Sequence, residues 1–106
     1  MTNSTIKRPF LIDNKYSSGE SITISGSSEY TIDKDGLLIF YCTATAAWGY
    51  AELKINSKII CTAQNGQTAA NTKYYGNIRV TKGDKIFWGN SNGGTTTATL
   101  FPYANN

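Results

Sequence analysis

The pattern of apolar and polar residues is strongest between Leu37 and Ala44, where both alternating faces of the segment are largely apolar or aromatic. This pattern is typical of a strand that is buried on both sides of a sheet. A helix is the competing interpretation, but Ile, Phe, Tyr, Cys and Thr favour the extended state. Gly36 and Gly49 also bound an apolar run of only about a strand's length. The segment therefore predicts a central strand, which follows the turn Asp33-Lys34-Asp35-Gly36.

Shorter alternating segments recur along the chain at intervals of roughly ten residues, separated by turn residues. The pair Asn56-Ser57 predicts a hairpin between two of these segments. No window has the periodicity of a helix. The fold class that follows is all-β, an antiparallel two-sheet β-sandwich that is jelly-roll-like and has about eight strands. We expect the strands at residues 21–25, 30–32, 37–45, 50–55, 58–62, 73–80, 85–88 and 95–103.

Two local features of these strands are specific enough to test. In the segment 73–80, Tyr75 and Ile78 both look like core residues but are out of phase, which predicts a bulge at Gly76. Residues 89–94 are rich in glycine and asparagine, which break both regular structures, and we expect a loop there.

The chain divides into a leader or connector at residues 1–17 and a β-sandwich domain at residues 18–106. The leader is polar and carries a short apolar knot at residues 9–12, which we expect to be pinned to the domain or to a neighbouring subunit. In the first strand of the domain, Ile22 and Ile24 alternate with polar residues and are expected to face inward.

Charge and the length of the apolar stretches argue against several classes of partner and location. The net charge is only +3, and the ten basic residues are scattered apart from Lys7-Arg8, so we expect no nucleic-acid binding. No stretch approaches the ~20 apolar residues that cross a bilayer, so we expect no membrane insertion. The segment Met1–Thr5 is not the start of a secretion signal, and we expect a protein that is made in the cytoplasm and stays soluble.

The residue inventory also argues against catalysis. The chain has no histidine, which removes the Ser-His-Asp and Cys-His arrangements and the commonest metal ligand. Cys42 and Cys61 fall inside predicted strands, where free buried thiols are favoured over a disulfide. The turn 33–36 resembles half of a calcium loop but lacks its remaining ligands. All acidic residues except Glu52 lie in turns, strand starts or the leader. We therefore expect no enzyme, no metal and no cofactor.

Three segments together resemble a known family. They are the strand-turn-strand around Asp33–Gly36, the hairpin at residues 52–60, and Ile78-Arg79-Val80-Thr81-Lys82-Gly83-Asp84-Lys85-Ile86. Over roughly residues 20–103 the chain resembles the receptor-binding tip domains of bacteriophage tail and head fibres, which look like the jelly rolls of tumour necrosis factor and complement. The resemblance implies a trimer in the virion, and it brings no fixed binding residues with it. A long stem usually precedes such tips, whereas about twenty residues do so here.

Pairs of adjacent rings give a separate reason to expect self-association. Tyr74-Tyr75 and Phe87-Trp88 lie in predicted strands, where neighbouring side chains point to opposite faces. One ring of each pair must then point away from its own core, and a partner surface would bury it. The alternative is that such rings are partly exposed beneath loops.

Loop-borne rings next to amides and hydroxyls suit the recognition of sugars. The alternative, that each ring fills core or interface, stays open for every one of them. The candidate ligand-binding residues are Trp48, Tyr50, Tyr74, Trp88, Asn90 and Asn92.

The leading hypothesis is a non-enzymatic fibre tip that forms a homotrimer and contacts a bacterial surface glycan or protein. The first alternative is a carbohydrate-binding module of a larger secreted enzyme, which would be monomeric. The second is a structural virion decoration protein without a ligand.

Overall fold

The computed structural model describes residues 20–24 and 28–104 and contains only strands and turns over that part of the chain. The leader with its knot at residues 9–12, and the side chains of Ile22 and Ile24, lie outside the described part. The strands are β2 (Glu20–Ile24), β3 (Ser28–Thr31), β4 (Gly36–Ala44), β5 (Tyr50–Ile55), β6 (Lys58–Gln64), β7 (Thr72–Val80), β8 (Lys85–Ser91) and β9 (Gly94–Pro102).

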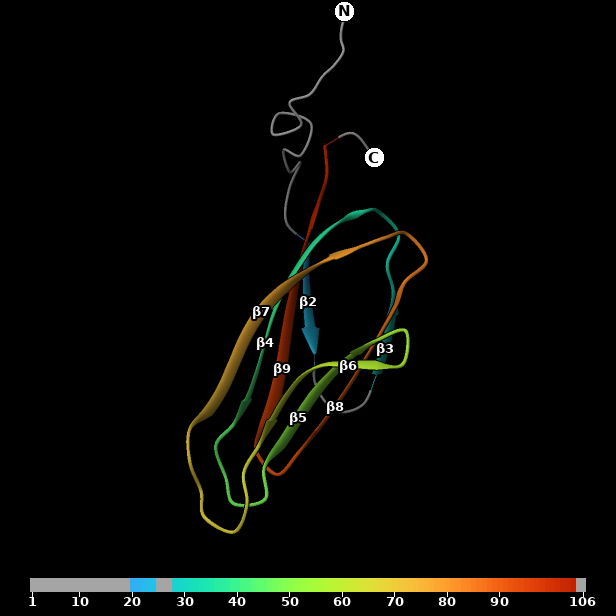
Figure 1. The fold of residues 1–106 in the computed structure, drawn as a ribbon. Coiled ribbons are helices and arrows are strands. Elements are labelled where there is room, and N and C mark those ends of the chain that lie inside the picture. The colour runs from blue at the N-terminus through green and yellow to red at the C-terminus, as the bar shows by residue number, and fades with distance from the viewer. Residues whose placement is uncertain (1–19, 25–27, 105–106) are drawn as a thin grey trace, which may run out of the picture.

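These strands form two antiparallel four-stranded sheets, in the orders β2-β9-β4-β7 and β3-β8-β5-β6, which lie against each other (Figure 1). The pairing is nested: β5 pairs with β6, β4 with β7, β3 with β8 and β2 with β9. Among the described strands, β5 and β6 are the consecutive pair that stays in one sheet. Each other connection carries the chain from one sheet to the other. The prediction of an all-β, two-sheet antiparallel fold is therefore confirmed.

The core lies between the sheets and follows the alternation of each strand. In β4, the odd-numbered side chains from Leu37 to Thr43 are partly or largely exposed and the even-numbered ones from Leu38 to Ala44 are buried. Complete burial of a large apolar side chain is worth about 1.5–3 kcal/mol, so β4 alone is a major source of stability. The largest fully buried apolar side chains are Ile32, Leu38, Leu53, Ile86 and Leu100.

The hairpin at residues 56–57 is confirmed. Asn56 and Ser57 both have positive φ, 50° and 72°, which is the backbone of the two-residue turns that match the twist of a hairpin. The Asn56 side chain secures the turn from outside, because its Nδ2 donates to Asp84 (2.9 Å) and its Oδ1 accepts from the Lys85 amide (2.9 Å).

The bulge predicted at Gly76 was wrong. The register between β4 and β7 runs unbroken from Gly36–Val80 to Ala44–Thr72. The prediction failed because Tyr75 is not a core residue: its side chain is 70% exposed. Gly76 stands opposite Phe40, whose ring occupies the space where a side chain would lie. The register does shift elsewhere, in the pairing of β5 with β6, between Leu53 and Lys54.

The loop predicted at residues 89–94 is mostly strand. β8 continues to Ser91 by pairing with β5, so the turn is confined to Asn92 and Gly93. Pairing with an existing central strand outweighs the poor strand propensity of glycine and asparagine. Cys42 and Cys61 are both free and buried, as expected. In the turn at 33–36, Asp35 Oδ1 accepts a hydrogen bond from the Lys82 amide (2.8 Å).

Candidate functional site

Three loops that are far apart in the sequence meet at one end of the sandwich (Figure 1). They are the β4–β5 connection at residues 45–49, the β6–β7 connection at 65–71 and the β8–β9 turn at 92–93. We call this the loop end. Gly94 makes the arrangement possible, because an added Cβ there would lie 1.8 Å from the carbonyl oxygen of Tyr50. The backbones of β5 and β9 can approach this closely only with glycine at that position.

A buried asparagine ties the loop end together. Asn65 is only 4% exposed, and its Nδ2 donates to the carbonyls of Ala46 (2.9 Å) and Ala70 (2.8 Å). Its Oδ1 accepts from the Thr72 hydroxyl, and its backbone N–H donates to the Gly49 carbonyl (2.9 Å). A buried polar side chain with all of its groups satisfied is a rigid connection, so it fixes two of the loops relative to each other.

This frame presents one large ring to solvent. Trp48 is 63% exposed and has a φ of 62°, a left-handed conformation that is rare for bulky residues. Its amide donates to the Gly66 carbonyl (2.7 Å), and its carbonyl accepts from Asn92 Nδ2 (3.3 Å). Such backbone strain persists where the surroundings hold it and is concentrated at functional sites. The loop end therefore has the features of a preorganised binding surface centred on Trp48.

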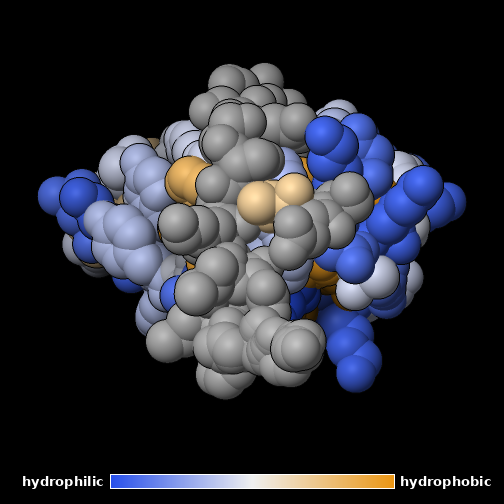
Figure 2. Space-filling model, turned by 90° about the horizontal axis from the view of Figure 1, so that it is seen from above, coloured by the Kyte–Doolittle hydropathy of each residue, from blue (hydrophilic) through white to orange (hydrophobic). Residues whose placement is uncertain are grey.

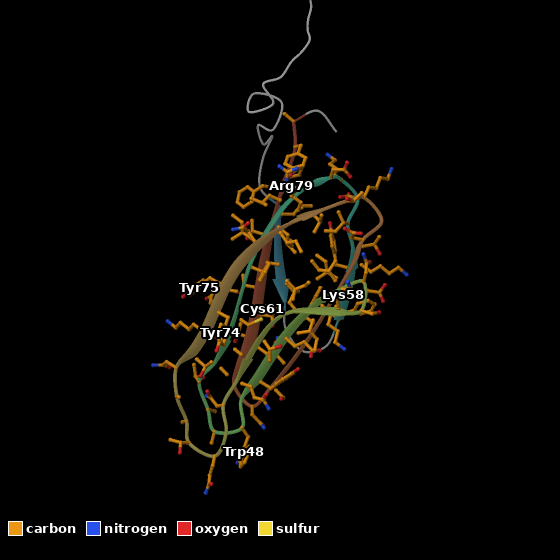
Figure 3. The ribbon with its side chains drawn as sticks, in the orientation of Figure 1. Trp48, Lys58, Cys61, Tyr74, Tyr75 and Arg79 are labelled. Carbon is orange, nitrogen blue, oxygen red and sulfur yellow. The ribbon has the colours of Figure 1, made fainter. Side chains whose placement is uncertain are left out.

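The structure brings together only some of the predicted ligand-binding residues. Trp48 and Asn92 lie together at the loop end, whereas Tyr74 lies on edge strand β7, along the side of the sandwich (Figure 3). Asn90 lies against the core, where its Oδ1 accepts from the Thr96 hydroxyl (2.7 Å). Trp88 is a core residue, 6% exposed, and its Nε1 is buried without a partner among the described residues.

Tyr50 lies on the outer face of β5 beside an acidic side chain. Its hydroxyl donates to a carboxylate oxygen of Glu52, while Lys54 Nζ lies 3.7 Å from the other oxygen. The hydrogen bond to the carboxylate, helped by partial burial, raises the pKa of Tyr50 to about 12. The phenol is therefore a donor even at a pH near 10, and it holds Glu52 in place.

Sequence reasoning missed Asn65 and Glu52 as positioning and contact residues. The only signal for Asn65 was its place in the polar run Gln64-Asn65-Gly66-Gln67, which looks like any loop. Its partners come from segments that are distant in the sequence, so its role depends on tertiary structure.

Two further surfaces carry exposed apolar groups. The first, the outer face of β4 and β7, carries Ile39 (45% exposed) and the stacked rings of Tyr41 and Tyr75, whose centroids are 5.0 Å apart. The second, the edge groove, is a hollow of about 360 Å³ beside the neighbouring edge strands β6 and β7, and Ile60 and Tyr74 are among the residues that line it.

The opposite end of the sandwich, with the turns at 32–35 and 81–84, is mostly hydrophilic where its atoms are described (Figure 2). Over the described residues, no group of three or more His, Cys, Asp or Glu side chains could hold a metal ion. The same part of the chain contains no helix that could span a membrane. No family model matches the chain, and no curated protein was found to match it.

Proposed function

We propose that this chain is the receptor-binding tip of a bacteriophage fibre, a non-enzymatic virion protein that binds a glycan or protein on the bacterial surface. The observation that carries the binding role is the exposed Trp48 ring, on a residue with a left-handed backbone in a loop that the buried Asn65 side chain ties down. An exposed indole on a fixed backbone is the type of group that dominates binding energy at recognition surfaces, because the backbone loses little conformational entropy when the ring is covered.

The nested strand pairing supports the jelly-roll part of the proposal. A long antiparallel hairpin that folds over itself places first and last strands together and alternates consecutive strands between the two sheets, as happens here. Eight-stranded jelly rolls are common in viral capsid and lectin domains, but the fold alone does not assign a function.

The apolar surfaces support a homotrimer. The outer face carries exposed side chains and the edge groove is a hollow beside it, so the face of one copy can pack into the groove of the next. A contact between two different surfaces relates each copy to the next by a fixed rotation. When three such rotations complete a full turn, the copies form a closed ring of three. In a trimer of this kind, all three loop ends could project toward one receptor surface, and weak single contacts would add up to avid binding.

Replacement of Trp48 tests the binding role. We expect Trp48→Ala to weaken binding to glycan arrays or to a panel of bacterial cells by about 30-fold or more, as for a hot-spot residue. The matched control is Ile59→Ala, which removes another exposed apolar side chain (59%) beside the hairpin turn and should leave binding unchanged.

The outcomes separate the proposal from its rivals. Equal loss of binding in both variants, or none in Trp48→Ala, would contradict a site at the loop end. A monomer that binds a soluble polysaccharide through Trp48 would indicate a carbohydrate-binding module instead. Absence of any binding to cells or glycans would favour a structural decoration protein.

A further inference from the structure

We propose that a hollow on the solvent-exposed side of the β3-β8-β5-β6 sheet, well apart from the loop end, binds a single neutral sugar ring. The hollow has a volume of about 520 Å³, within the range of small-molecule sites. Its lining comes from strands β3, β5 and β8 and from the hairpin turn, and includes Glu29, Glu52, Lys54, Ser57, Phe87 and Gly89.

The strand register creates the hollow. In β8, Phe87 pairs with Glu29 of β3 and with Lys54 of β5. Two residues further along β8, Gly89 pairs with Glu52 of β5. Residues two apart in a strand point to the same face, so Phe87 and Gly89 share the outward side. Gly89 has no side chain to project beside Glu52, and Gly89 and Phe87 both line the hollow.

The polar groups of the hollow are held in fixed positions before a ligand arrives. Glu52 receives the Tyr50 hydroxyl on one carboxylate oxygen and lies 3.7 Å from Lys54 Nζ through the other, with its side chain 18% exposed. Each carboxylate oxygen can accept a second hydrogen bond. Two oxygens of one carboxylate can therefore accept from two adjacent hydroxyl groups, an arrangement that suits a vicinal diol.

Charge balance selects a neutral ligand. Glu29 and Glu52 disfavour an anion, and each already has a lysine within 4 Å, Lys85 at 3.8 Å and Lys54 at 3.7 Å, with which a cation would have to compete. A polyhydroxylated ring can use both signs at once, because its hydroxyls donate to the carboxylate and accept from the ammonium group. Phe87 supplies an apolar surface for the C–H face of the ring.

This site is independent of the proposed receptor-binding role. It lies on the sheet that does not carry the outer face of β4 and β7, so self-association through that face leaves it open to solvent. Its residues are also separate from Trp48 and Asn92.

The test is a titration of the ¹⁵N-labelled full chain with methyl pyranosides of glucose, galactose, mannose and N-acetylglucosamine, followed by amide chemical shifts. Each sugar is used up to about 20 mM, roughly twenty times a 1 mM dissociation constant. We expect at least one sugar to shift the amides of Glu52, Phe87 and Gly89. Glu52→Gln should weaken that sugar about tenfold or more, since it removes a charged hydrogen-bond acceptor.

Two variants check the location and one serves as a control. Gly89→Val should abolish binding by filling the hollow. The amide spectrum of this variant reports whether it folds. If Gly89→Val does not fold, Glu52→Gln still tests the location. Asp33→Asn, which changes an acid outside the lining, should bind as the unaltered chain does. Shifts confined to Trp48 and Asn92, unchanged affinity in Glu52→Gln, preferential binding of methylammonium, or no binding by any of the four sugars would each overturn the inference.

Discussion

Cys42 shows how strongly a single residue here is governed by its surroundings. Its side chain is fully buried between the sheets, next to the Cys61 thiol and 3.7 Å from the Thr96 hydroxyl. Burial, and then the neighbouring thiol, raise the pKa of Cys42 from an ordinary value near 9 to about 12. The thiolate is the reactive form of cysteine, so a buried thiol of this kind should be inert.

We expect Cys42 to react with iodoacetamide at pH 8 at least about 100-fold more slowly in the native chain than in urea, since very little thiolate forms. A Cys61→Ser background leaves Cys42 as the only thiol to be measured. Equal rates with and without urea would contradict the buried position.

The raised pKa also gives stability a pH dependence of known sign. Because the folded chain holds the proton more tightly than the unfolded one, the contribution of Cys42 is fully present below about pH 9. It is lost as the pH rises from about 9 to about 12, where the unfolded chain releases the proton first. The raised pKa of Tyr50 acts in the same direction.

Among the elements, β4 and β7 depend on one glycine for their close fit. A Cβ at Gly76 would lie 2.8 Å from Cζ and 2.9 Å from Cε1 of Phe40, a core side chain that is 6% exposed. The ring cannot retreat without disturbing its neighbours, because protein interiors are close-packed.

We expect Gly76→Ala to lower the free energy of unfolding by about 1–3 kcal/mol, the usual range for overpacking. The matched control is Gly66→Ala, where an added Cβ meets nothing within 4 Å and should be neutral or stabilising by up to about 1 kcal/mol. Urea denaturation at one fixed protein concentration measures both. If the steric reason is correct, adding Phe40→Leu to Gly76→Ala should cost less than the sum of the single changes. Similar stability of Gly76→Ala and Gly66→Ala would show that Phe40 adapts without strain.

The same elements show what the sequence could and could not predict. The strand from Gly36 to Ala44 was predictable because its apolar run needs no information from elsewhere in the chain. The orientation of Tyr75 was not, since a strand with several rings has no unambiguous phase. Trp48 and Trp88 show the same limit, because both are followed by glycine and this local sequence does not tell which ring is buried. Trp88 lies within β8, at a position of the alternation that faces the core, while Trp48 lies in the β4–β5 loop and is exposed.

At the scale of the whole molecule, the loop end, the candidate sugar hollow and the outer face of β4 and β7 point in different directions. The loop end lies at one end of the sandwich, the candidate sugar hollow on the outer side of one sheet, and the exposed face of β4 and β7 on the other sheet. Self-association through the outer face and the edge groove would thus cover apolar area while leaving both candidate binding sites open. Exposed apolar patches on a folded chain typically mark such interfaces.

We expect light scattering on the full chain at micromolar concentration to give about 35 kDa, three times the chain mass of 11.6 kDa. Ile39→Lys changes the outer face, outside the lining of the groove, and Tyr74→Lys changes the edge groove. A buried unpaired lysine at either place should reduce the mass to that of one chain. Trp48→Ala should remain trimeric, because its ring lies at the loop end.

A mixture of the two lysine variants tests the geometry of the ring. If each contact joins the outer face of one copy to the edge groove of the next, every Tyr74→Lys chain keeps an intact face and every Ile39→Lys chain keeps an intact groove. An equimolar mixture at high concentration should then form one contact per pair and stop at about 23 kDa, twice 11.6 kDa. Two variants that stay monomeric when mixed would rule out a contact between face and groove, and a monomeric unaltered chain would rule out self-association through either surface.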